Sequence, residues 1–298
     1  MTFLNVWGHM STQILFDGFQ PQTGDSEAIS SFVSACKTEF SLALDALISV
    51  AFVADFSAFC QNFDDGFGAN DPPDPSDLAV GITPELLVEG ELRSQVILPA
   101  SVAERFRRPH STQDRLEANY ILAHELAHAD EHYRRGHAFG AEVIDSHVNP
   151  NPLRLGARAT WSEYYVCWKV AKVSPPISQP MGETLIRATE EFGSLCSTAP
   201  ERIRYVRDKD RLKGELISSG IRFQIAAARL LGHMDGLGKD LNEECPSVLV
   251  YICDENLTSA FGQMHEVLRM LWGTFPKWQS LAALDSILVP LNTHLTSI

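Results

Sequence analysis

The stretch YILAHELAHADEH, residues 120–132, places His124, Glu125 and His128 inside an otherwise apolar run. On a helix, residues four apart lie one turn above each other on the same face, so the two histidine rings can be directed at one ion. The glutamate is rotated by one residue and stands beside that ion rather than on it. His and Glu are also poor residues for a core. The pattern therefore predicts a metal-binding helix, and the alternative is a helix with two structural histidines.

Zinc suits this arrangement, because imidazole is a good ligand for it and because it has no redox chemistry of its own. Bound zinc lowers the pKa of its water to about 7, which makes hydroxide available at neutral pH. Glu125 is placed to take the proton from that water. The flanking residues are uncharged, as a buried active-site helix requires: Ile121, Leu122, Ala123, Leu126, Ala127 and Ala129. We therefore expect a Zn2+ hydrolase site with His124 and His128 as ligands and Glu125 as general base.

A catalytic zinc needs a third protein ligand and one open position. Glu163 is the best candidate, in the apolar and aromatic stretch ATWSEYYVCWKVAKV (159–173), which we expect to form a second helix. Burying a lone carboxylate is costly, and a bound metal would offset that cost. His132 continues the face of the first helix one turn further out, and we expect it to support the site or to face solvent. Other candidate ligands lie in an expected loop after that helix: His137, Glu142, Asp145 and His147.

The side chains around Glu163 leave two roles open. Cys167, one turn after Glu163, could face the metal as a thiolate, but a small buried cysteine is the more frequent case. The oxyanion of a tetrahedral intermediate also needs a hydrogen-bond donor. Tyr164, Tyr165 and His147 are candidates for that role, and the sequence does not choose among them.

The spacing of apolar residues predicts further helices and strands along the chain. We expect Ser111 to cap the start of the motif helix and Gly136 to end it. The strand at 93–99 is expected at the edge of a sheet, where an extended peptide could add as a further strand. The remaining expected elements are a helix at 26–48, strands at 49–59 and 78–83, a loop at 62–77, and helices at 181–195, 201–235, 256–273 and 279–289.

The order of these elements resembles that of the ImmA/IrrE-like metallopeptidases. HELAHADEH (124–132) is similar to the family's metal-binding helix, with His132 in the place of its further histidine, and EYYVCWKVAKVSPP (163–176) is similar to its glutamate helix. The resemblance covers about residues 26–175. It implies a gluzincin-type zincin, with Glu163 as a ligand, that makes a limited cut in a protein partner, commonly a DNA-binding repressor of the helix-turn-helix class. The helix-turn-helix module often fused to family members is not apparent in this chain.

We therefore expect an α+β protein with two domains. A zincin-like peptidase domain, with helices and a small antiparallel or mixed sheet, would occupy residues 1–175. A mostly helical domain at 176–298 would recognise the substrate, sense a trigger or mediate assembly. The boundary is expected at the proline-rich stretch SPPISQP, residues 174–180.

Charge and cysteine content indicate what kind of partner the protein binds and in which cellular compartment we expect it. Residues 1–92 carry fourteen acidic side chains and one basic one, Lys37, whereas the rest of the chain is almost balanced. Such a surface disfavours direct nucleic-acid binding and favours a basic partner. Six scattered cysteines, and no basic and apolar leader at the start, lead us to expect a cytoplasmic protein with reduced thiols. The most apolar window, 41–60, carries two aspartates, so no membrane span is expected.

Together these observations predict a zinc-dependent endopeptidase that acts on a protein partner. The alternative is a catalytically idle zincin fold that serves as a regulatory binding module. An occluded metal site would favour that alternative.

Overall fold

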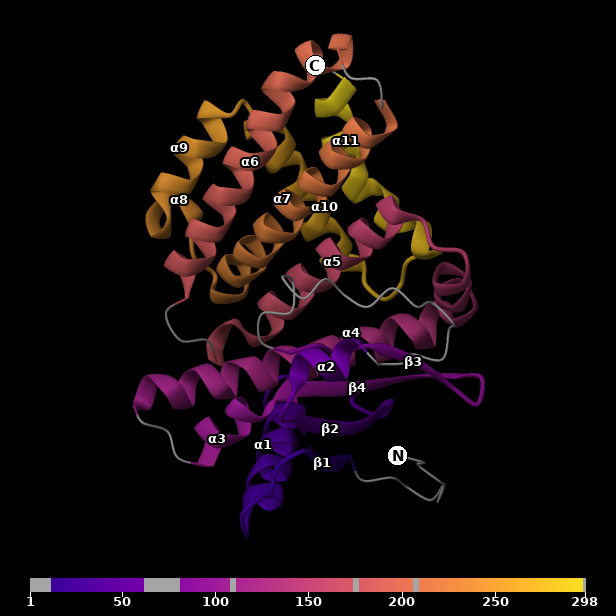
Figure 1. Ribbon diagram of the computed structural model, residues 1–298, viewed down its shortest axis with the longest axis vertical. Coiled ribbons are helices and arrows are strands. Elements are labelled where there is room, and N and C mark those ends of the chain that lie inside the picture. Colours follow the sequence, from indigo (N-terminus) through magenta and orange to yellow (C-terminus); the bar gives the residue numbers. More distant parts are fainter. Residues whose placement is uncertain (1–11, 62–80, 108–110, 174–176, 206–208, 297–298) are drawn as a thin grey trace. The chain divides into compact units, whose positions relative to one another are not determined.

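The computed structural model describes residues 12–61, 81–107, 111–173, 177–205 and 209–296 (Figure 1). Within them the protein is mostly helical and has one small mixed sheet, so the expected α+β composition is confirmed. The chain divides into two compact units, Met1–Gly140 and Ala141–Ile298. The sequence predicts the boundary between the two domains at residues 174–180, of which 174–176 lie outside the described residues. No helix in the described ranges is both long and apolar enough to cross a membrane.

The sheet of the first unit has four strands in the order β1-β2-β4-β3. Both β1 with β2 and β2 with β4 pair in parallel, whereas β3 pairs antiparallel with β4. The strand bounds are β1 Gln13–Asp17, β2 Leu47–Val53, β3 Glu85–Val88 and β4 Glu91–Pro99. The expectation that 93–99 forms the sheet edge is therefore wrong, because β4 lies between β2 and β3.

A tight turn explains why β4 is not the edge. Val88 pairs with Glu91, so only Glu89 and Gly90 form the loop between β3 and β4. Both have positive φ, at 54° and 84°, as a type I′ hairpin turn requires. The turn folds β3 back along β4 and makes β3 the edge. Of the strand expected at 78–83, residues 78–80 lie outside the described part of the chain. The loop expected at 62–77 lies outside it entirely. Ile82, which is described, forms an isolated antiparallel bridge with Ile97.

The front of the chain folds into shorter elements than the apolar pattern predicts. Helix α1 spans Asp25–Glu39 rather than 26–48, and Ser41 then adopts a left-handed φ of 51°, which turns the chain towards β2. Strand β2 is buried along almost its whole length, as its run LISVAFV predicts, but it ends at Val53. The Asp55 side chain accepts a hydrogen bond from the Ala58 backbone N–H at 2.9 Å and caps the short helix α2, Phe56–Gln61. Strand β1 was not expected from the sequence.

Helix α4, Thr112–Val148, carries the histidine motif and follows α3, Ala100–Arg107. The Ser111 hydroxyl accepts a hydrogen bond from the Asp114 N–H at 3.0 Å, so the expected N-terminal cap is confirmed. The helix does not end at Gly136, and its only break in helical geometry is at Phe139. Gly136 instead lies against β4, where a Cβ would stand 3.1 Å from a Leu92 methyl group. It is a packing glycine, and the loop expected after it is helical.

The second unit is helical throughout its described residues. The bounds are α5 Pro152–Val170, η1 Ala171–Val173, α6 Ser178–Tyr205, α7 Lys209–Leu237, α8 Leu241–Glu244, α9 Pro246–Asp254, α10 Thr258–Thr274, η2 Leu281–Ile287 and α11 Leu288–Thr296. The helices expected at 181–195 and 256–273 are confirmed in outline, and α6 continues through Pro200. The helix expected at 201–235 corresponds to the end of α6 and to α7. Helices α8 and α9 were not expected.

Helices α5 and α7 approach each other closely enough to require glycine at their contact. A Cβ on Gly232 would stand 2.3 Å from the Tyr164 carbonyl oxygen, and one on Gly236 would stand 2.4 Å from that of Trp168. The Tyr164 hydroxyl donates to the Asp235 carboxylate at 2.7 Å across the same contact. This packing fixes the register of α7 along α5, the helix that carries Glu163.

Candidate metal centre

Helix α4 presents the two motif histidines on one face, as their spacing predicts. The ring centroids of His124 and His128 lie 4.9 Å apart, with the ring planes at 77° to each other. Leu122, Ala123, Leu126 and Ala127 of the same segment are fully buried, which fixes the rotation of the helix about its axis. The two histidines themselves are only half-buried, so their rings remain accessible to an ion.

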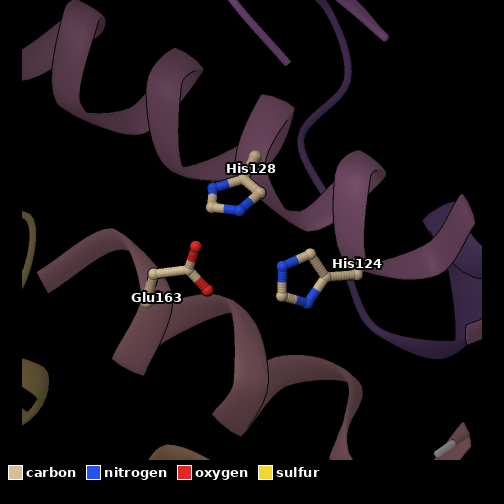
Figure 2. Close-up of side chains that lie close together, drawn as sticks. All are labelled: His124, His128 and Glu163. Carbon is tan, nitrogen blue, oxygen red and sulfur yellow. The ribbon is translucent and has the colours of Figure 1, made fainter. Parts of the chain in front are cut away.

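Glu163 lies with these histidines in one group. Each of the three side chains offers one ligand atom, and these atoms all lie within 4.8 Å of one another. Figure 2 shows the Glu163 carboxylate directed towards the two imidazole rings. Two imidazole nitrogens and one carboxylate oxygen form a ligand set found in catalytic zinc sites. The residues present therefore fit a divalent metal ion.

Helix α5 holds Glu163 in place because its N-terminus is capped and the residues around Glu163 are buried. The Asn151 side chain accepts hydrogen bonds from the Leu153 and Arg154 N–H groups, and Pro152 occupies the first turn, where its missing N–H costs nothing. Around Glu163 the helix is buried, including Trp161, Tyr164, Tyr165 and Val166. The Glu163 side chain is 13% exposed, and the expectation of a carboxylate in an apolar helix is confirmed.

Glu125 is held by the segment that precedes β3. Thr83 Oγ1 donates to the Glu125 carboxylate oxygen Oε2 at 2.8 Å and lies 3.0 Å from the Glu125 backbone oxygen. Gly81 lies on the same side, where a Cβ would stand 3.1 Å from Glu125 Cγ and 2.6 Å from a Leu98 methyl group. Glu125 is buried. The carboxylate that we expect to act as base is therefore fixed by a hydroxyl donor and by a close backbone approach.

Arg229 of α7 contacts the Glu163 carboxylate. Its guanidinium donates to Glu163 Oε1 at 2.7 Å, and its side chain is 43% exposed. An ionised donor at this distance makes a charge-assisted hydrogen bond, which is stronger than a neutral one. The sequence pattern does not reveal Arg229 as a partner of Glu163, because 66 positions separate the two residues.

A buried ion network lies one to two turns beyond the histidines on α4. Arg135 donates to the Glu131 carboxylate at 2.8 Å and lies 3.0 Å from a Glu85 oxygen of β3, and all three side chains are almost fully buried. Burial alone would lower the pKa of Arg135, but the charges of Glu131 and Glu85 outweigh burial and raise it. His132 borders this network, with Nδ1 3.3 Å from Ser94 Oγ and Nε2 3.9 Å from a Glu131 oxygen. His132 therefore lies on the side of α4 that faces the sheet, and it is not in the ligand group.

The other candidate ligands lie apart from the group of three. His137, Glu142 and Asp145 are exposed on α4, and Glu142 accepts a hydrogen bond from the Leu281 N–H. His147 lies 3.2 Å from an Arg158 nitrogen. Among the residues that the structure describes, His124, His128 and Glu163 are the only three side chains of ligand type whose donor atoms converge in this way.

The residues proposed as oxyanion donors or as a thiolate are engaged in packing. The Tyr164 hydroxyl donates to Asp235, and burial, followed by that hydrogen bond, raises the pKa of Tyr164. The Tyr165 ring packs against Trp272 and Phe275. Cys167 is fully buried, in line with its interpretation as a small apolar residue.

Comparison of the chain with protein-family models, with curated proteins and with solved structures found no match.

Proposed function

We propose that the protein is a zinc-dependent endopeptidase, with His124, His128 and Glu163 as metal ligands and Glu125 as general base. One observation carries the proposal: the donor atoms of these three ligand side chains converge within 4.8 Å, and the first two belong to a helical HExxH motif. Chance placement of two histidines on a helix would not bring a carboxylate from another helix to the same point.

We assign each residue of the site a separate role in the reaction. Bound zinc would supply a Lewis acid and a water molecule of lowered pKa. His124 and His128 would hold the ion through ring nitrogens, and Glu163 would add an oxygen and a negative charge that offsets part of the charge of the ion. Glu125 takes a proton from water at its carboxylate and can return it to the amine nitrogen released when the peptide bond breaks. Thr83 keeps that carboxylate oriented.

The proposed fold is zincin-like. A small sheet whose antiparallel edge strand, β3, contacts the HExxH helix through Arg135 supports this assignment. The resemblance to ImmA/IrrE-like metallopeptidases supports a cytoplasmic enzyme that makes limited cuts. It also supports a catalytic role for the domain at 1–175. For the helical region at 176–298, which the resemblance does not cover, we propose a role in recognition, sensing or assembly.

The proposed substrate is a protein partner, and a helix-turn-helix repressor is the class that the resemblance implies. The acidic surplus of residues 1–92 supports a basic partner, because DNA-binding proteins present a positive surface. Complementary charge would steer association and would weaken as salt is raised. The same surplus argues against direct binding of nucleic acid.

The test is metal binding together with cleavage. Purified protein is titrated with Zn2+ and then incubated with a peptide library generated from a whole proteome, whose new termini are read by mass spectrometry. We expect one equivalent of zinc and cleavage that disappears in Glu125→Gln. Failure to bind zinc would refute the metal site. Tight zinc binding without any cleavage would instead favour an idle zincin fold that serves as a regulatory binding module.

A further inference from the structure

We infer that Arg229 is the positioning residue for Glu163, and that it acts on metal binding through that carboxylate. The inference rests on the proposed metal site and names a residue that the HExxH pattern cannot reveal. The observation behind it is the 2.7 Å hydrogen bond from the Arg229 guanidinium to Glu163 Oε1.

The register of α7 along α5 makes this contact a fixed one. Gly232, three residues after Arg229, meets the backbone of Tyr164, which is the neighbour of Glu163. Asp235, one turn further along α7, accepts a hydrogen bond from the Tyr164 hydroxyl. These contacts set the register of α7 along α5. The arginine is therefore delivered to the carboxylate by the backbone packing of the two helices rather than by a chance surface encounter.

An arginine on one oxygen of a ligand carboxylate restricts how that carboxylate can turn. A guanidinium donates along fixed directions, so it orients its acceptor better than an ammonium group does. Holding Oε1 fixes the plane of the carboxylate and the direction in which its other oxygen faces. Hydrogen-bond partners of metal ligands commonly change metal affinity by about 10–100-fold when removed.

A surface salt bridge would look similar but would behave differently. Exposed ion pairs contribute little to stability. Arg222 provides the matched control, because it lies on the same helix, two turns earlier, and pairs with Glu191 at the surface. Its side chain is 48% exposed, close to the 43% of Arg229, but its partner is no ligand.

The experiment is a double-mutant cycle on metal affinity, which needs no substrate. Dissociation constants for Zn2+ are measured by competition with a chromophoric chelator for wild type, Arg229→Met, Glu163→Gln and the double variant. We expect Arg229→Met to weaken zinc binding by about tenfold or more and to have no further effect when Glu163 is already Gln. Arg229→Lys, which keeps a charged donor, should recover part of the affinity, and Arg222→Met should bind as wild type does.

Visible spectra of the Co2+-substituted proteins provide a second readout. The spectrum of Arg229→Met should differ from that of wild type if the carboxylate is freed to turn, whereas that of Arg222→Met should not. Thermal unfolding of the metal-free variants identifies any loss of folding. Wild-type affinity in Arg229→Met, or an equal loss in the presence and absence of the Glu163 carboxylate, would overturn the inference while leaving the metal site intact. Failure of the wild type itself to bind either ion would overturn both proposals.

Discussion

Thr83 donates a hydrogen bond of 2.8 Å to the carboxylate of Glu125, although 42 residues separate them in the chain. The donor belongs to the segment that enters the edge strand, and the acceptor belongs to the motif helix. The sheet therefore orients the residue that we propose as the base, while the helix orients the proposed histidine ligands. Orientation of the base and binding of the metal are thus assigned to different side chains and can be tested separately.

Thr83→Val should lower turnover by about 10–100-fold, because it removes a hydrogen bond to a charged group while keeping the shape of the side chain. Zinc content should stay the same, since Thr83 does not belong to the ligand group. Thr83→Ser keeps the hydroxyl and should retain most of the activity. Peptide cleavage and zinc content of the three proteins are compared, and wild-type turnover in the valine variant would show that the hydrogen bond plays no part.

Glu125→Gln should abolish cleavage while zinc remains bound. The amide keeps the size of the side chain but cannot accept the proton, and general-base catalysis typically contributes about 10²–10⁴-fold. Cleavage rate and zinc content are measured on the same preparation. A variant that still cleaves at the wild-type rate would remove Glu125 from the mechanism.

His124→Ala and Glu163→Gln should both weaken zinc binding, the histidine variant more strongly. Metal that binds only the folded state also stabilises it, so added zinc should raise the melting temperature of wild type and raise that of the variants less. Glu163→Gln should leave the metal-free fold intact, because the amide keeps the length of the side chain. Melting curves with and without zinc provide the measurement. Full zinc binding by Glu163→Gln would exclude Glu163 as a ligand.

Arg135→Met should destabilise the protein by about 3–5 kcal/mol, because it leaves the Glu85 and Glu131 carboxylates buried without their cation. Arg105→Met is the control, since its pair with Glu117 is 40% exposed on both sides and should contribute less than about 1 kcal/mol. Urea unfolding of both variants gives the comparison. Equal losses would mean that the buried network adds nothing beyond a surface pair.

His233 should make the protein less stable in mild acid. Burial, together with the charge of Lys239, lowers its pKa from 6.5 to about 4 in the folded state. Between these values the unfolded chain binds a proton that the folded chain does not, so stability falls as the pH drops from 6.5 to 4 and levels off below that. The loss from this one group amounts to roughly 3 kcal/mol.

The matched variant for that prediction is His233→Gln, which cannot titrate. Urea unfolding at several pH values should show a smaller acid-induced loss in the variant than in wild type. Parallel curves for the two proteins would show that His233 is not the group responsible.

The sequence predicts the parts of the site that lie close together in the chain. His124 and His128 share a helical turn, and Ser111 caps their helix, because both relations follow from local spacing. The apolar and aromatic pattern around Glu163 also predicts its helix. The cost of burying a lone carboxylate there predicts its role as a ligand. Long-range partners were not predicted: Thr83 and Arg229 are ordinary surface residue types, and only the folded chain brings them to Glu125 and Glu163.

The wrong predictions about the fold have a common physical cause, which is tertiary packing. Gly136 is a residue type typical of a helix stop, yet it lies inside α4, packed closely against Leu92, whose methyl group is 3.1 Å from the place a Cβ would take. Strand 93–99 has the pattern of a strand, but its position in the sheet depends on the two-residue turn at Glu89 and Gly90. Local patterns indicate the type of an element, and neighbours that are distant in sequence decide where it ends and what flanks it.

The contact at Gly232 reverses the usual meaning of a glycine in a helix. Replacing glycine by alanine in an exposed helix interior normally stabilises the helix by about 1 kcal/mol, because the backbone loses less entropy. Here the added methyl group would lie 2.3 Å from the Tyr164 carbonyl oxygen, so α7 would have to move away from α5. A change that makes α7 a better helix in isolation would therefore make it a worse partner for α5, and the hydrogen bond between Arg229 and Glu163 would be stretched by a substitution that touches neither residue.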